Sequence, residues 1–116
     1  MVKLILVGKS YCAMCRFAHA LLNQPAITDK YELLCVNSFS LFSKENCLDL
    51  IGADRAYGVL TNLNNDPRYK SGVMLFKEEG DGSVKLVDLT KQLTLAATYG
   101  TDSVSIPELV AAIDSA

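Results

Sequence analysis

Two cysteines near the amino terminus are the residues whose type and spacing most directly suggest chemistry. Cys12 and Cys15 are separated by two residues and stand between an apolar run, residues 2–7, and a helical pattern that starts at Arg16. The start of a helix offers unpaired backbone N–H groups and the positive end of the helix dipole. A thiolate at this place is stabilised, so its pKa falls, and the thiolate is the nucleophile of thiol chemistry. The second sulfur lies one turn further on, within reach of a disulfide, so the pair is predicted to be a redox device.

The elements that must position this pair alternate between strands and helices. The strand expected at 2–8, the helix at 12–23 and the strand at 31–37 form a unit whose two strands should be parallel with a right-handed crossover. An Asp-Gly turn between two apolar runs predicts a hairpin further along the chain. Residues 61–71 are polar and turn-rich and are expected to form a loop, with Gly58 ending the helix before it. The expected elements are strands 2–8, 31–37, 73–77 and 84–87, and helices 12–23, 43–57 and one capped by Ser105, with 88–100 ambiguous between helix and loop.

This element order, β-α-β-α-β-β-α, predicts an α/β fold in which helices cover both faces of a four-stranded mixed sheet. At 116 residues, residues 1–116 are expected to form a single domain. A net charge of −2 without a Lys/Arg cluster argues against nucleic-acid binding. No apolar run is long enough to span a membrane, and the first one is too short for a signal peptide. The expected location is therefore the cytoplasm, where four cysteines indicate metal binding, catalysis or burial rather than a disulfide framework.

The element order with Cys-x-x-Cys at the start of the first helix resembles the thioredoxin fold, and the local sequence is closer to glutaredoxins. The active-site stretch of glutaredoxins typically reads Lys-x-x-Cys-Pro-Tyr-Cys-x-x-Ala-Lys-x-Leu-Leu. In this chain the matching positions are Lys9, Cys12, Cys15, Ala18, Leu21 and Leu22, whereas Ala13, Met14 and His19 depart from the pattern. The resemblance implies that Cys12 attacks a protein or small-molecule disulfide and that Cys15 resolves the mixed disulfide. It also implies a monomer that needs no tightly bound cofactor and is recharged by glutathione or thioredoxin reductase.

Further site residues follow from the same resemblance. Lys9 could stabilise the thiolate or hold a carboxylate of glutathione, although a solvated turn lysine is the alternative. Tyr11 would form an apolar wall beside the dithiol, and Asp102 could receive the ammonium group of glutathione unless it only caps a turn. The cis-proline of the family would fall near Ser71 and Gly72, where this chain has none. That departure puts the docking of substrate in question and leaves metal binding more open.

Two rival hypotheses concern the same motif. Cys12, Cys15 and His19 lie at i, i+3 and i+7 of a helix and could hold zinc with a fourth ligand from elsewhere. Alternatively, the chain could be a thioredoxin-fold interaction or adaptor module whose Cys-x-x-Cys is structural. The other two cysteines, Cys35 and Cys47, are expected to pack in the core, because free cysteine behaves as a small hydrophobe.

Overall fold

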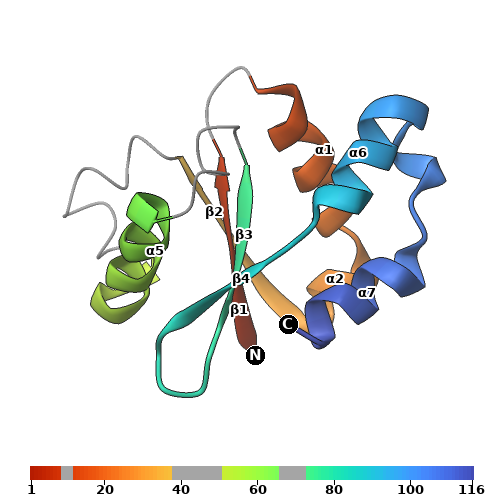
Figure 1. Ribbon diagram of the computed structural model, residues 1–116. Coiled ribbons are helices and arrows are strands. Elements are labelled where there is room, and N and C mark those ends of the chain that lie inside the picture. Colours follow the sequence, from red (N-terminus) through yellow and green to blue (C-terminus); the bar gives the residue numbers. More distant parts are fainter. Residues whose placement is uncertain (9–11, 38–50, 66–72) are drawn as a thin grey trace.

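A four-stranded mixed sheet is the centre of the molecule. The structure is a computed structural model that describes residues 1–8, 12–37, 51–65 and 73–116. The strand order is β2-β1-β3-β4. Strand β1 (Val2–Gly8) pairs in parallel with β2 (Tyr31–Asn37) and antiparallel with β3 (Met74–Glu78), which pairs antiparallel with β4 (Val84–Val87). The mixed sheet and the parallel first pair confirm the predicted topology (Figure 1).

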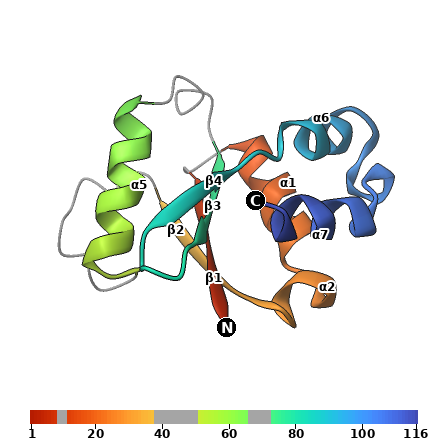
Figure 2. The ribbon, with the colours of Figure 1, turned by 60° about the horizontal axis from the view of Figure 1, so that its bottom comes forward.

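Helices cover both faces of this sheet, as predicted. Helix α5 (Ala53–Asn65) lies against one face, and α1 (Ala13–Leu22), α6 (Thr90–Tyr99) and α7 (Ile106–Asp114) lie on the other (Figures 1 and 2). Each face has its own apolar core. Strand β1 contributes Leu4 and Leu6 to the α1 side and Ile5 and Val7 to the α5 side, and all four are buried. A strand covered on both faces explains why its sequence is continuously apolar.

The last helix begins where the sequence indicated. Ser105 is the N-cap of α7, and its Oγ accepts a hydrogen bond from the backbone N–H of Glu108 at 3.4 Å. Helix α6 settles the ambiguous stretch as helical, and Gly100, with φ of 95°, follows its last residue. A short 3₁₀ helix, η2 (Thr101–Ser103), then leads toward α7. A further short helix, α2 (Pro25–Thr28), follows α1, so Pro25 both ends one helix and opens the next.

The predicted end of the middle helix is wrong. The structure continues α5 to Asn65, through Gly58 and into the stretch expected to be a loop. The predicted helix is also interrupted at Gly52, whose φ is 84°, so that α5 begins at Ala53, while the predicted start at Ser43 lies outside the described residues. A Cβ atom at position 58 would lie 3.0 Å from Cγ2 of Val84 on β4. The glycine therefore allows α5 to approach the hairpin closely, and it does not stop the helix.

The expectation for Cys35 is also wrong. Strand β2 lies at the edge of the sheet, and Cys35 is exposed on it. Leu34 and Val36 beside it face the α5 side of the sheet, where a core does form. An apolar run predicts a strand but does not distinguish an edge from a centre. Cys47 lies outside the described residues.

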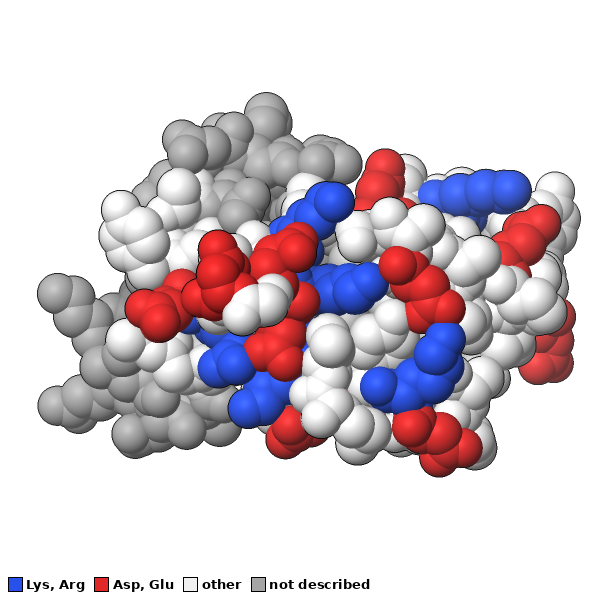
Figure 3. Space-filling view, turned by 90° about the horizontal axis from the view of Figure 1, so that it is seen from below, with Lys and Arg blue, Asp and Glu red and all other residues white. Residues whose placement is uncertain are grey.

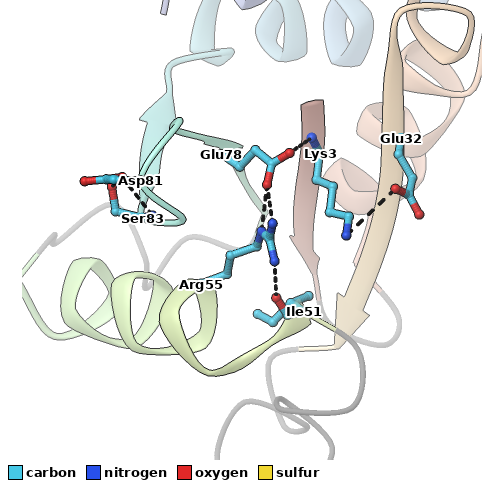
Figure 4. A network of polar contacts seen from close by, with 7 residues as sticks. All are labelled: Lys3, Glu32, Ile51, Arg55, Glu78, Asp81 and Ser83. Atoms are coloured by element: carbon cyan, nitrogen blue, oxygen red, sulfur yellow. Dashed lines mark hydrogen bonds and ion pairs between the residues drawn. The ribbon is translucent and has the colours of Figure 1, made fainter. Parts of the chain in front are cut away.

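A polar network ties β1, β3 and α5 together at the end of the sheet that carries the N-terminus. Glu78 accepts hydrogen bonds from the backbone N–H of Lys3 and from Nε of Arg55, both at 2.8 Å, and it also pairs with Nη2 of Arg55 (Figure 4). Burial would raise the pKa of Glu78, but these hydrogen bonds and the positive charges of Arg55 and Lys3 bring it below its usual value. Nη1 of Arg55 donates to the carbonyl of Ile51 at 3.1 Å, which fixes the first turns of α5.

Acidic and basic side chains are intermixed on the face that carries this end of the sheet (Figure 3). No single-signed patch dominates this view, in keeping with the near-balanced charge of the sequence. Within the part of the chain that the structure describes, none of the helices is both long and apolar enough to cross a lipid bilayer.

Candidate functional site

Cys12 stands at the start of α1, where the sequence placed it. It is the N-cap residue, with extended backbone angles of φ −101° and ψ 117°. Its Sγ accepts a hydrogen bond from the backbone N–H of Cys15 at 3.3 Å, and its side chain is half-buried. An N–H donor and the positive end of a helix both favour the thiolate over the thiol. The position of Cys12 at the N-cap, with a backbone N–H donor to its sulfur, therefore favours ionisation of its thiol.

Cys15 lies in the first turn of the same helix and packs against the end of β1. A Cβ atom built on Gly8 would lie 3.2 Å from Sγ of Cys15 and 3.4 Å from its Cβ. The absence of a side chain at Gly8 leaves the space that the Cys15 sulfur occupies. The hydrogen bond from its N–H to Cys12 keeps the two residues within one helical turn, as dithiol chemistry requires.

An apolar cavity of about 300 Å³ lies between α1, the start of α6 and the sheet. Met14, which stands between the two cysteines, forms part of its wall, together with Ala18 one turn further along α1. The start of α6 supplies Leu89, Thr90, Leu93 and Thr94 on another side, and Figure 1 shows α1 and α6 next to each other. The remaining wall comes from the middle of the sheet and from Val73, just before β3. Met14 therefore connects the cavity to the segment between the cysteines, although neither Cys12 nor Cys15 is among the described residues that line it.

Asp88, between β4 and α6, brings a carboxylate to this cavity. Its Oδ1 accepts hydrogen bonds from the backbone N–H of Thr90 at 3.0 Å and from Oγ1 of Thr90 at 2.6 Å. These bonds hold the first turn of α6 in place. Sequence reasoning missed Asp88 because the stretch that it opens was ambiguous. An Asp two residues before a Thr at the end of a strand is a local turn signal that could have indicated it.

The structure separates the other predicted site residues into two groups. Lys9, Tyr11, Ser71 and Gly72 lie outside the described residues. Asp102 is exposed in η2, beyond the C-terminal end of α6, and is not among the described residues that line the cavity. Its contact with glutathione stays a prediction.

The zinc hypothesis gains no support from the described residues. His19 is exposed in the last turn of α1. Across residues 1–8, 12–37, 51–65 and 73–116, no three His, Cys, Asp or Glu side chains gather closely enough to hold a metal ion. The i, i+3, i+7 spacing on one helix therefore does not by itself make a ligand set.

Comparison with known proteins yields similarity in structure but not in sequence. No protein-family model matches the chain, and neither does any curated protein sequence. Among solved structures, the chain is similar to G4, described as the poxviral disulfide oxidoreductase essential for cytoplasmic disulfide bond formation, with a TM-score of 0.57 and 23% sequence identity. The match covers 97% of this chain and 91% of that chain. The fold is thioredoxin-like, as the resemblance implied.

Proposed function

We propose that this protein is a thiol–disulfide oxidoreductase of the glutaredoxin/thioredoxin type that uses Cys12 as nucleophile and Cys15 as resolving thiol. The Cys12 thiolate attacks one sulfur of a substrate disulfide, forms a mixed disulfide and releases the other sulfur as a thiolate. Cys15 then loses its proton and attacks Cys12, which releases the second substrate thiolate and leaves a Cys12–Cys15 disulfide. Two electrons pass from the dithiol to the substrate, and glutathione or thioredoxin reductase would return them.

The observation that carries this proposal is the hydrogen bond from the Cys15 N–H to the Cys12 sulfur at the start of α1. It favours the ionised form of the attacking group and holds the resolving residue one turn away. The thioredoxin-like fold supports the proposal, because other proteins with this fold carry out the same chemistry at the same place. The cytoplasmic setting in the description of G4 agrees with the cytoplasmic location that we propose for this chain.

The direction of disulfide exchange is a separate question. G4 is described as a protein of disulfide bond formation, and this favours a second candidate function, in which this protein oxidises its substrates. In that case the oxidised form of this protein would donate its disulfide to reduced substrates, and an oxidant would restore it. The redox potential of the Cys12–Cys15 pair discriminates between the two. A value near that of thioredoxin, about −270 mV, supports reduction of substrates, whereas a value near that of DsbA, about −120 mV, supports donation of disulfides.

The test of the proposal is a pair of single variants assayed for reduction of insulin and of a small mixed disulfide. Cys12→Ser should lower the rate by at least about 100-fold, because the attacking thiolate is lost. Cys15→Ser should instead accumulate a mixed disulfide on Cys12 that mass spectrometry detects. Cys35→Ser, at the exposed edge of the sheet, should react like the wild type.

The rival hypotheses give different results in the same experiments. If wild type and Cys12→Ser are equally inactive with either reductant, the enzyme proposal fails and the adaptor hypothesis gains. If protein purified without chelator carries one equivalent of zinc, and Cys12→Ser loses it, the metal hypothesis gains.

A further inference from the structure

We infer that helix α6 opens away from α1 and the sheet as a separate unit, and that the buried side chain of Gln92 sets how often it does so. The inference concerns a movement built into the fold and does not depend on the proposed function. Because the start of α6 forms one wall of the cavity between α1, α6 and the sheet, this movement changes the size of that cavity.

Gln92 lies on the buried face of α6, which is otherwise apolar. Its side chain is 7% exposed, and it is the one buried polar or charged residue in the part of the chain that the structure describes. Leu89, Leu93 and Ala96, which share this face of the helix, belong to the core on the α1 side of the sheet. The closed position of α6 therefore removes the amide of Gln92 from water together with its apolar neighbours.

The buried amide of Gln92 makes the closed position of α6 less stable than a fully apolar face would. A glutamine side chain offers two N–H donors and a carbonyl acceptor. Among the described residues, no hydrogen-bonding group of the protein pairs with either end of this amide. Burial of a polar group without a hydrogen bond shifts an equilibrium by roughly five- to 150-fold toward the state in which water reaches that group. An open position of α6 is favoured by this factor.

The polar contacts of α6 with the rest of the molecule are few. Lys91 forms an ion pair with Glu108 of α7 at 3.7 Å, but both side chains are exposed, and surface pairs of this kind add little stability. Within the described part of the chain, no side chain of residues 90–99 bonds to any of the four strands. Helix α7 differs, because Nζ of Lys77 on β3 donates to the carbonyl of Ile113 at 3.0 Å. We therefore expect α6 to open while α7 stays on the sheet.

Amide hydrogen exchange, followed by NMR at pH 7, measures this opening. A helix amide exchanges only when its hydrogen bond opens, so its rate reports the population of the open state. In the wild type, the amides of Leu93 and Ala96 should exchange at least about tenfold faster than the amide of Ile5 in the centre of β1. Their rates should also respond less to low concentrations of urea, because the opening of one helix exposes less surface than global unfolding.

Substitution of Gln92 tests whether its amide is the cause. Gln92→Met removes the amide at nearly the same shape and helix propensity. Leu93 and Ala96 should then exchange roughly five- to 150-fold more slowly than in the wild type, because the closed state no longer buries an unpartnered polar group. Gln24→Met is the matched control. Nε2 of Gln24 donates to the carbonyl of Leu21 at 2.9 Å, so this substitution removes a hydrogen bond and should not slow exchange in α6.

Two results would overturn the inference. If Gln92→Met leaves exchange in α6 unchanged or makes it faster, the amide is satisfied in the closed state, for example by an ordered water, and does not drive the opening. If the amides of α6 exchange at the rate of Ile5 and with the same response to urea, α6 does not open separately from the rest of the fold. Neither result involves the chemistry of Cys12, so the oxidoreductase proposal stands or fails by the cysteine variants alone.

Discussion

At the scale of single residues, the absence of a side chain at Gly8 leaves space for the sulfur of Cys15. A methyl group at this position would approach Sγ of Cys15 to 3.2 Å, closer than ordinary contacts allow. Gly8→Ala should therefore displace Cys15, lower the free energy of unfolding by about 1 kcal/mol and slow the closure of the Cys12–Cys15 disulfide. Urea unfolding measures the first effect, and the lifetime of the mixed disulfide on Cys12 measures the second.

Gly80 supplies the control for this substitution. It lies in the hairpin turn, and a Cβ there would meet no atom within 4 Å. Gly80→Ala should leave both the unfolding free energy and the lifetime of the mixed disulfide close to their wild-type values. Equal behaviour of the two variants would show that the contact between Gly8 and Cys15 affects neither the stability nor the closure of the disulfide.

Half-buried Cys12 and exposed Cys35 should differ in reactivity. Partial desolvation raises the pKa of Cys35 above its ordinary value, so its thiolate is scarce at neutral pH. Cys12 has a backbone N–H donor that favours its thiolate. At pH 7 we expect iodoacetamide to alkylate Cys12 at least about tenfold faster than Cys35, as peptide mapping by mass spectrometry would measure. Faster labelling of Cys35 would contradict the assignment of Cys12 as nucleophile.

The candidate site was only partly predictable from the sequence. The cysteine pair could be found because its setting is local: a strand ends, two cysteines follow and a helix begins. The role of Met14 as a cavity wall could not be found, and the local turn signal at Asp88 indicates a turn but not the cavity that its carboxylate reaches. Met14 and Asp88 line one cavity only after β3, β4 and α6 have been placed against α1, and no local spacing encodes that arrangement.

At the scale of elements, the contact between α5 and β4 limits which residue can occupy position 58. Alanine in a helix interior is usually more stable than glycine by about 0.5–1 kcal/mol. Here the added Cβ would lie 3.0 Å from Cγ2 of Val84 and 3.4 Å from its backbone nitrogen. We therefore expect Gly58→Ala to lower the free energy of unfolding by about 1 kcal/mol, against the helix propensity. Chemical unfolding with far-UV circular dichroism measures it.

A second background shows whether the close approach is the cause. Val84→Ala removes Cγ2 and is itself destabilising, because Val84 is buried. In that background, Gly58→Ala should become neutral or stabilising, so the double-mutant cycle should give a favourable coupling. An equal loss in both backgrounds would mean that the distance to Val84 does not explain the glycine.

The elements that could be predicted are those with local sequence signals. Strand β2 and helix α7 form where expected, because an apolar run and a Ser N-cap with Pro in the first turn are local signals. The extent of α5 was missed because Gly58 and the Asn-rich end of this helix have the composition of a turn. Packing against the hairpin overrides that local preference. The exposure of Cys35 was missed for a related reason: strand order decides burial, and strand order is a property of the whole sheet.

At the scale of the whole molecule, a polar clamp fastens the last helix to the sheet. Nζ of Lys30 donates to Asp114 at 2.6 Å, and the hydroxyl of Tyr31, at the start of β2, donates to the same carboxylate. Nζ of Lys77 on β3 donates to the carbonyls of Ile113 at 3.0 Å and Asp114 at 3.1 Å. A positive charge at the C-terminal end of a helix also favours its dipole. Segments from the first third, the middle and the end of the chain are joined at this point.

This clamp should make the stability of the protein depend on pH on both sides of neutrality. The hydrogen bonds from Lys30 and Tyr31 lower the pKa of Asp114, so the stability that it adds is present above the unfolded value of about 3.9 and is lost as pH falls through the lower folded value. Burial, the hydrogen bond to Asp114 and the charge of that group raise the pKa of Tyr31 to about 12. Its contribution is present below the unfolded value of about 10 and is lost as pH rises toward 12.

Substitution of Asp114 tests the acid side of this dependence. Asp114→Asn should lower the urea midpoint at pH 7, and the difference from wild type should shrink as pH falls below about 4, because the wild-type carboxylate is then protonated as well. Asp29→Asn removes an exposed carboxylate next to Lys30 that takes no part in the clamp, so its midpoint should follow wild type at each pH. A constant difference between Asp114→Asn and wild type from pH 7 to pH 2.5 would mean that shape, rather than charge, is what Asp114 contributes. If the difference disappears in acid, the ionised carboxylate is what holds α7 to the sheet, and α7 should be the element that detaches first at low pH.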